Sequence, residues 1–335
     1  MLRLPPYRYH RPRELDAALA LLAEHAGDAM PIAGGTDLVP NMKHKLFTPG
    51  HLVALKGIDA MRGIEVVAGG GPYLRIGAGE TLAAIAAHAD VRGWLPSLAE
   101  AAGQVAGPQL RNAGTIGGNV CLDTRCTYYN QTQFWRTALG YCLKKDGDEC
   151  HVTKTGKKCV AAQSADTPPV LATLGASVLL RSAGGERVVA IDDFFIADGI
   201  TNTVREPGEL VVEVRVALPG ARTRMAYRKL RQRNSIDFPL LSVAAAGEFA
   251  EDGTVEDLRV VVSALGARQR ALSGIDKVAV GNELDDDVMD AVAERAFAQC
   301  HPLTNIIVDP DWRRAMVPVH VRRALEALEP APLAV

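Results

Sequence analysis

The chain has 335 residues, enough for two or three domains, and a formal net charge of −2. Hydrophobic residues make up 48% and charged residues 23% of it, as in ordinary globular proteins. The charge gives no general attraction to nucleic acid or to an anionic membrane. No apolar run approaches the ~20 residues of a membrane span, and the N-terminus lacks the apolar centre of a secretory signal. We therefore expect a cytoplasmic protein that binds neither nucleic acid nor membrane.

The first 120 residues predict one amphipathic helix followed by short strands. Over residues 11–27, apolar side chains recur at helical spacing, and Gly27 stands where a C-terminal cap is expected. The residues of this apolar face are Leu15, Ala18, Leu19 and Leu22. Strand-like runs follow at residues 30–40, 51–58, 73–82 and 105–120. The third of these runs leads into a helix that Thr81 should cap.

The second half of the chain reads as strands followed by helices. Three β-rich runs are separated by turn residues, at 175–182, 186–195 and 209–219. The pattern then changes, and a hairpin with its turn at Glu251–Gly253 is predicted next. Two helices follow, at residues 285–300 and 319–328. We place a domain boundary near residue 221, which leaves a C-terminal α+β domain at 222–335.

Two glycine pairs each follow an apolar run. They occur in Ala33-Gly34-Gly35-Thr36-Asp37 and in Thr115-Ile116-Gly117-Gly118-Asn119. Paired glycines let the backbone turn and expose bare N–H groups, an arrangement that suits phosphate or pyrophosphate. Neither segment is a G-x-G-x-x-G fingerprint or a P-loop. An ordinary tight turn explains either one alone, but two such loops with hydroxyl and Asp or Asn neighbours indicate a candidate dinucleotide site.

Five of the six cysteines lie within residues 121–159. They are Cys121, Cys126, Cys142, Cys150 and Cys159. Disulfides are rare in the cytoplasm, so this grouping favours a metal. Structural zinc usually uses C-x2–4-C pairs, which only the first two cysteines approach. An iron–sulfur cluster needs four thiolates, yet the spacings match neither common ferredoxin pattern. From the spacing alone, a zinc site and an iron–sulfur cluster are both possible interpretations. Both are favoured over the third interpretation, in which the cysteines bind nothing.

Four sequence features follow one another along the chain: the first glycine loop, the segment IGAGETL at 76–82, the second glycine loop, and Lys229 within YRKLRQRNSIDFP. Their order resembles that found in the FAD-binding subunits of the molybdenum hydroxylase family. The resemblance covers nearly the whole chain. It implies an α+β protein: a two-subdomain FAD-binding fold of the vanillyl-alcohol-oxidase type, followed by the C-terminal domain. The FAD-binding domain would span 1–221, with subdomains at about 1–58 and 59–221.

The resemblance also implies where the cofactor lies. The FAD diphosphate would lie on both loops, and we expect the backbone N–H groups of both glycine pairs to face it. An Asp and a later Lys would also contact FAD, although the Asp lies far beyond the second loop because the cysteine-rich stretch intervenes. The implied cofactor-binding residues are Ala33, Gly34, Gly35, Thr36, Asp37, Thr115, Gly117, Gly118, Asn119, Asp166 and Lys229.

Within that family, the stretch at 121–163 is similar to an insertion in the flavin subunits of 4-hydroxybenzoyl-CoA reductases, which carry an extra 4Fe–4S cluster. The similarity implies four ligands, namely Cys126, Cys142, Cys150 and Cys159. Cys121 would then be a small buried residue on a strand that leaves the second loop, and Cys300 would belong to the C-terminal core. The aromatic residues expected to form the insertion's own small core are Tyr128, Tyr129, Phe134 and Trp135.

The resemblance implies an electron-transfer subunit with no catalytic residues of its own. Its partners would be a 2Fe–2S small subunit and a molybdenum-bearing large subunit that reductively removes the ring hydroxyl of 4-hydroxybenzoyl-CoA. The insertion holds seven basic and four acidic residues, a balance that suits docking of an acidic one-electron donor such as ferredoxin. Two alternatives stay open: the flavin subunit of an oxidative molybdenum hydroxylase that delivers electrons to NAD or quinone, and a zinc-stabilised binding module.

Overall fold

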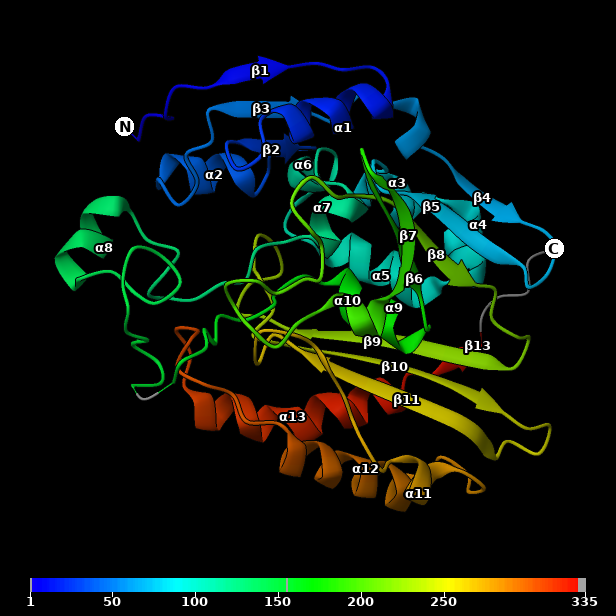
Figure 1. Cartoon of the computed structure of the whole chain (residues 1–335). Helices are drawn as coiled ribbons and strands as arrows, with labels where there is room; N and C mark the ends of the chain where they lie inside the picture. The colour runs from blue at the N-terminus through cyan, green and yellow to red at the C-terminus, as the bar shows by residue number, and fades with distance from the viewer. Residues whose placement is uncertain (1, 155, 331–335) are drawn as a thin grey trace.

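The computed structural model describes residues 2–154 and 156–330, and its described part contains three β-sheets (Figure 1). Their strand orders are β1-β3-β2, β4-β5-β8-β6-β7 and β12-β11-β10-β9-β13. The first sheet is parallel, and the other two are antiparallel. Sheets and helices together give the predicted α+β architecture. No helix in the described part combines the length and the apolar character that a membrane span requires.

The first sheet joins β1 (Arg8–His10), β3 (His51–Ala54) and β2 (Ala29–Ile32). Helix α1 (Leu15–Glu24) packs against it, and helix α2 (Leu38–Lys43) follows the first glycine pair. The buried side chains of α1 are Leu15, Ala18, Leu19 and Leu22. The helical spacing therefore predicted this buried face correctly.

Helices lie in the chain between the strands of the second sheet. Its strands are β4 (Ile64–Val67), β5 (Tyr73–Gly77), β8 (Leu210–Ala217), β6 (Ser177–Ser182) and β7 (Gly185–Ala190). A 3-10 turn, η1 (Asp59–Met61), precedes β4. The connections between the strands hold α3 (Leu82–Ala87), α4 (Ala89–Trp94), α5 (Pro96–Gln104), α9 (Thr167–Thr173) and α10 (Ile191–Phe194). Thr81 caps α3 as predicted, because its Oγ1 accepts a hydrogen bond from Ala84 N at 3.1 Å.

Residues 105–120 do not form the predicted strand. They fold into the short helices α6 (Pro108–Arg111) and α7 (Ile116–Val120). Pro108 suits the first turn of a helix, and Thr115 caps α7 by accepting a hydrogen bond from Gly118 N at 3.1 Å. The second glycine pair thus lies in the first turn of a helix rather than after a strand.

The third sheet comprises β9 (Thr223–Leu230), β10 (Leu241–Phe249), β11 (Val255–Ser263), β12 (Arg270–Ala271) and β13 (Glu329–Pro330). Helices α5 and α9 pack on one face and α13 packs on the other, as Figure 1 shows. Successive residues of a strand point to opposite faces. Accordingly Ala244 joins the core beneath α9, whereas Val243 and Ala245 join the core beneath α13. Burial on both faces explains why these strands are apolar throughout.

The C-terminal helices complete this domain. After the predicted hairpin of β10 and β11 come α11 (Asp276–Ala279), α12 (Asp286–Gln299) and α13 (Pro310–Leu325). Helix α13 begins well before the predicted residue 319. Asp309 caps it by accepting a hydrogen bond from Trp312 N at 2.7 Å, and Pro310 suits its first turn.

The cysteine-rich insertion leaves the domain through a narrow neck. Arg125 and Ala162 exchange two backbone hydrogen bonds, of 2.8 and 2.7 Å. Beyond this neck, helix α8 (Gln133–Leu139) projects to one side of the molecule (Figure 1). Phe134 is 85% exposed and Trp135 is 39% exposed, so the expectation that they help form a core is wrong.

The side chain that α8 buries is instead Arg136. Its guanidinium donates hydrogen bonds to the carbonyls of His44 and Lys45, at 3.0 and 3.2 Å. The insertion is therefore anchored to the segment after α2 by a buried arginine. Tyr129 is buried as predicted, beside Leu46 of that segment.

Candidate functional site

The first glycine loop connects the end of β2 to the start of α2. Gly35 has φ +69, a left-handed conformation that favours glycine. The backbone N–H groups of Gly34, Gly35 and Thr36 have no hydrogen-bond acceptor among the described residues. Successive bare N–H groups at such a turn form a concave anion site. This loop therefore fits the diphosphate of FAD.

The second glycine pair is used differently. Gly117 N donates to Ala78 O at 3.0 Å, and Gly118 N donates to Thr115 Oγ1 at 3.1 Å. Both N–H groups are therefore paired within the chain, and the expectation that they face a ligand is wrong. Gly117 is needed for packing, because a Cβ there would lie 2.8 Å from Ala78 Cβ. Gly118 is exposed, so its surface stays open to a ligand.

The two glycine segments meet in space although they lie far apart in the sequence. A Cβ on Gly34 would lie 1.9 Å from Ala113 O and 2.8 Å from Gly114 N. Glycine at 34 thus lets the first loop touch the backbone that leads into α7. The first glycine loop and the segment before the second glycine pair are therefore in contact.

Asp166 and Lys229 also come together. The Lys229 Nζ lies 2.8 Å from Asp166 Oδ1, and Tyr227 OH donates to the same oxygen at 2.7 Å. Lys229 Nζ donates to Gln104 O as well, at 3.1 Å. Burial raises the pKa of Asp166 and lowers that of Lys229, and their mutual attraction opposes both shifts. The pair joins the start of α9 to β9, and its contact with FAD stays a prediction.

Arg125 is a site residue that the sequence analysis missed. Its Nη1 lies 3.0 Å from Asp37 Oδ1, and its guanidinium lies 4.0 Å from the centre of the Phe238 ring. Burial raises the pKa of Asp37, and the charge of Arg125 opposes this shift. Arg125 thereby links the first glycine loop, the neck of the insertion and the loop before β10. Only its position beside Cys126 could have drawn attention to it.

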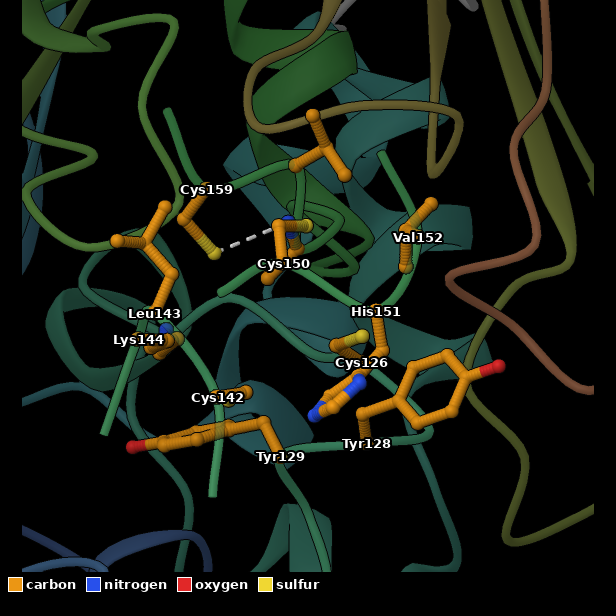
Figure 2. Close-up of a pocket in the computed structure, with 12 residues that line it drawn as sticks. Cys126, Tyr128, Tyr129, Cys142, Leu143, Lys144, Cys150, His151, Val152 and Cys159 are labelled. Atoms are coloured by element: carbon orange, nitrogen blue, oxygen red, sulfur yellow. Dashed lines mark hydrogen bonds between the residues drawn. The ribbon is translucent and has the colours of Figure 1, made fainter. Parts of the chain in front are cut away.

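Four cysteines of the insertion line one small pocket, which Figure 2 shows with Tyr128, Tyr129 and His151 on one side. Cys126 follows the neck and Cys159 precedes it on the return, while Cys142 and Cys150 come from the loop after α8. All four are free thiols and buried. The structure thus brings together the four cysteines that the family resemblance implied.

The two remaining cysteines lie elsewhere. Cys121 ends helix α7 rather than continuing a strand, and it packs against the main core. Cys300 is 1% exposed in the core beneath α13, as predicted. Neither lines the pocket in Figure 2.

The four thiols, as placed, do not form the ligand shell of a single zinc ion. Among the described residues, no three of the four Sγ atoms lie within 4.8 Å of one another. Four thiolates around one zinc, each at about 2.3 Å, would lie about 3.8 Å apart. A cluster with a separate iron atom for each thiolate holds its ligands further apart.

Hydrogen bonds to sulfur distinguish the four thiols. Burial raises the pKa of Cys126 to about 11. Burial also acts to raise the pKa of Cys150, but hydrogen bonds from Thr153, Val152 and Val160 outweigh it and lower that pKa. Ala161 N donates to Cys159 Sγ at 3.4 Å, which is the dashed line in Figure 2. Donors that point at sulfur favour its thiolate form, but burial outweighs the Ala161 donor and raises the pKa of Cys159.

Gly199 is a second residue that the sequence analysis missed. Its N–H donates to Cys159 O at 2.8 Å, and a Cβ there would lie 2.7 Å from Cys159 Sγ. Its carbonyl accepts a hydrogen bond from Lys144 Nζ at 2.7 Å. Gly199 follows α10, far along the chain from the cysteines, so no sequence spacing could connect them.

Lys144 does not belong to a docking surface. Its side chain is only 5% exposed, and its Nζ lies 2.6 Å from Asp123 Oδ1 and 4.5 Å from the centre of the Tyr129 ring. Arg125 and Arg136 are likewise engaged inside the protein. The exposed part of the insertion is therefore less basic than its composition suggested.

Comparison with known proteins finds family matches over most of the chain. Residues 5–219 match the family described as the FAD binding domain in molybdopterin dehydrogenase, and residues 225–328 match the CO dehydrogenase flavoprotein C-terminal domain. The carbon monoxide dehydrogenase medium chain of Hydrogenophaga pseudoflava is 29% identical over 323 residues, or 96% of this chain and 97% of that one. The aldehyde oxidoreductase FAD-binding subunit PaoB of Escherichia coli is 32% identical over 299 residues, or 85% and 88% of the two chains.

The fold is shared with solved structures as well. Carbon monoxide dehydrogenase from Hydrogenophaga pseudoflava, in a form that lacks the Mo-pyranopterin moiety of the molybdenum cofactor, matches with a TM-score of 0.79 at 28% identity. The match covers 97% of this chain and 98% of that one. Together with the two family matches and the bare N–H groups of the first glycine loop, it identifies the chain as a member of the FAD-binding subunits of the molybdenum hydroxylase family.

Proposed function

We propose that this flavin subunit also carries one 4Fe–4S cluster and passes electrons through a molybdenum-containing oxidoreductase. One observation carries the proposal: Cys126, Cys142, Cys150 and Cys159 meet in a buried pocket. Their number is that of the thiolates such a cluster needs, and their spacing exceeds that of a zinc site.

The residues of this chain would have distinct tasks. The first glycine loop would bind the FAD diphosphate, and Arg125 would hold Asp37 of that loop beside the neck of the insertion. The four cysteines would hold the cluster, while Gly199 and the donors to sulfur would fix their positions. When bound, the two groups supply one-electron and two-electron redox chemistry.

The reaction that we propose for the complex is reductive. The partners would be a 2Fe–2S small subunit and a molybdenum-bearing large subunit in the cytoplasm, and the substrate would be 4-hydroxybenzoyl-CoA, which loses its ring hydroxyl. The similarity of the cysteine insertion to those of such reductases supports this choice. A second candidate is an oxidative hydroxylase that delivers electrons to NAD or quinone. It is favoured by the relatives, which include a carbon monoxide dehydrogenase and an aldehyde oxidoreductase.

Assays of the purified complex distinguish these two functions. With a reduced low-potential dye as donor, the reductive enzyme should convert 4-hydroxybenzoyl-CoA to benzoyl-CoA. With an oxidised dye as acceptor, the oxidative enzyme should instead turn over carbon monoxide, an aldehyde or an N-heterocycle. Turnover of only the second group would overturn the reductive proposal while leaving the cluster in place.

Gly199→Ala should lower the iron content of the purified chain severalfold while FAD stays bound. The new Cβ would lie 2.7 Å from Cys159 Sγ and 2.8 Å from Ala161 N, so Cys159 must shift. Gly266→Ala is the matched control, because a Cβ there meets nothing within 4 Å. Iron and FAD analysis of both variants checks the prediction. Unchanged iron in Gly199→Ala would mean that Cys159 is not held by this contact.

Ferredoxin is the electron donor that we propose, and the surface that would bind it is smaller than the composition suggested. The exposed lysines of the insertion are Lys154, Lys157 and Lys158. Replacing all three with Glu should slow reduction of the complex by ferredoxin severalfold at low salt, because opposite charges steer association. Reduction by a small neutral dye should not change.

A control variant carries the same change in charge on a part of the surface outside the insertion. Lys56, Arg268 and Lys277 are exposed and lie outside the insertion. Their replacement with Glu should leave the ferredoxin rate closer to that of the parent. Stopped-flow measurements at low and high salt check both variants, since salt screens this attraction beyond about 10 Å at 0.1 M. Equal rates for the two variants would rule out docking on the insertion.

A further inference from the structure

Three histidines, from the first sheet and the segment after α1, lie side by side. His10 ends β1, His25 follows α1 and His51 begins β3. His10 Nε2 lies 3.0 Å from His51 Nδ1, and the ring centres of His25 and His51 are 3.6 Å apart. One nitrogen of each ring lies within 4.8 Å of the other two. No other histidine, cysteine or carboxylate group of the described residues meets this criterion.

The distances between these ring nitrogens are close to those between the ligands of one metal ion. Nitrogens bound tetrahedrally to zinc at about 2.0–2.1 Å lie about 3.3 Å apart. All three side chains are partly exposed, so an ion can reach them from solvent.

Two carboxylates lie near the three rings. Glu24 Oε1 is 3.8 Å from His25 Nε2, and its side chain is 69% exposed and able to turn. The Asp28 carboxylate accepts a hydrogen bond from Gly50 N at 2.7 Å, next to His51 in the chain. Both charges favour a nearby cation.

We propose that His10, His25 and His51 bind one divalent transition-metal ion, with Zn²⁺ as the ion of choice. Imidazole ligands suit Zn²⁺, Cu²⁺ and Ni²⁺ rather than Mg²⁺ or Ca²⁺. Glu24 or a water molecule completes the shell.

The role of this ion is structural. His51 pairs with Ala29 at the start of β2, whereas the first glycine loop follows Ile32 at its end. A four-residue strand separates the two by about 10 Å. The ion ties together β1, the end of α1 and β3, which are three separate elements.

Calorimetric titration of the untagged, FAD- and iron-loaded chain with Zn²⁺ tests the proposal, after a mild chelator wash that leaves the iron content unchanged. We expect saturable binding at one site per chain and a rise in Tm of several degrees, with no such rise on addition of Mg²⁺. His25→Gln and His51→Gln should each weaken binding at least tenfold and abolish the Tm rise. His301→Gln, an exposed histidine elsewhere, should bind Zn²⁺ as the parent does.

The readouts separate this site from the cysteine pocket. Iron and FAD contents should be the same in the parent and in all three histidine variants. Absence of saturable Zn²⁺ binding by the parent, or undiminished binding in both His25→Gln and His51→Gln, would overturn the proposal. Either result would leave the assignment of the iron–sulfur pocket unaffected.

Discussion

Cys142→Ser should remove about four iron atoms per chain, one cluster, while leaving FAD bound. Cys142 lines the pocket together with the other three cysteines, and serine oxygen is a poor substitute for a thiolate toward a 4Fe–4S cluster. The glycine loops lie outside this pocket and should keep their shape. Iron analysis and the flavin absorbance of the purified variant measure the two effects separately. Cys126→Ser, Cys150→Ser and Cys159→Ser should each behave in the same way.

Two cysteines outside the pocket provide matched controls. Cys121→Ser and Cys300→Ser should both retain iron and FAD, because one residue ends α7 and the other lies in the core beneath α13. Loss of iron in Cys121→Ser together with full iron in Cys126→Ser would show that the ligand set is wrong. Loss of iron in all of the variants would point to a general folding defect instead.

Gly35→Val should lower FAD occupancy at least tenfold and leave the iron content unchanged. Gly35 has φ +69, which a β-branched side chain strongly disfavours. A Cβ there would also lie 3.2 Å from Ile32 Cδ1 and from Val39 Cγ2. The loop would have to move, and the bare N–H groups of Gly34, Gly35 and Thr36 would no longer converge. Flavin released by denaturation, measured per chain, checks this prediction.

Gly57→Val is the control for backbone strain. Gly57 has φ +96 in an exposed loop after β3, and a Cβ there meets nothing within 4 Å. This variant should keep its FAD although the strain is similar. Equal FAD contents in Gly35→Val and Gly57→Val would mean that the first glycine loop is an ordinary turn. The diphosphate would then have to bind elsewhere.

The sequence correctly predicted those helices and turns whose formation depends on interactions between residues close together in the chain. The apolar face of α1, the cap at Thr81 and the hairpin of β10 and β11 follow from side-chain spacing, capping and turn chemistry. Residues 105–120 were misread, because a glycine pair after an apolar run looks like a turn after a strand. In the structure Thr115 caps a helix there, and Gly117 packs on Ala78, a partner that no local pattern reveals.

The site was predictable only in part. Cysteine spacing could not select the four thiols, because the neck formed by Arg125 and Ala162 brings Cys126 next to Cys159 across the insertion. The family resemblance supplied that grouping. Gly199 and the buried position of Lys144 depend on a loop far along the chain. The three histidines come from three separate elements, so their meeting also follows from the fold.

Metal, flavin and spectral analysis of the purified chain tests the central claim most directly. We expect about one FAD and about four iron atoms per chain, with broad iron–sulfur absorbance beneath the flavin bands that dithionite bleaches. Zinc bound at the histidines should disappear in His51→Gln without any change in iron. A yellow protein with full FAD and no iron, under anaerobic purification, would contradict the account and leave the cysteine pocket without its cluster.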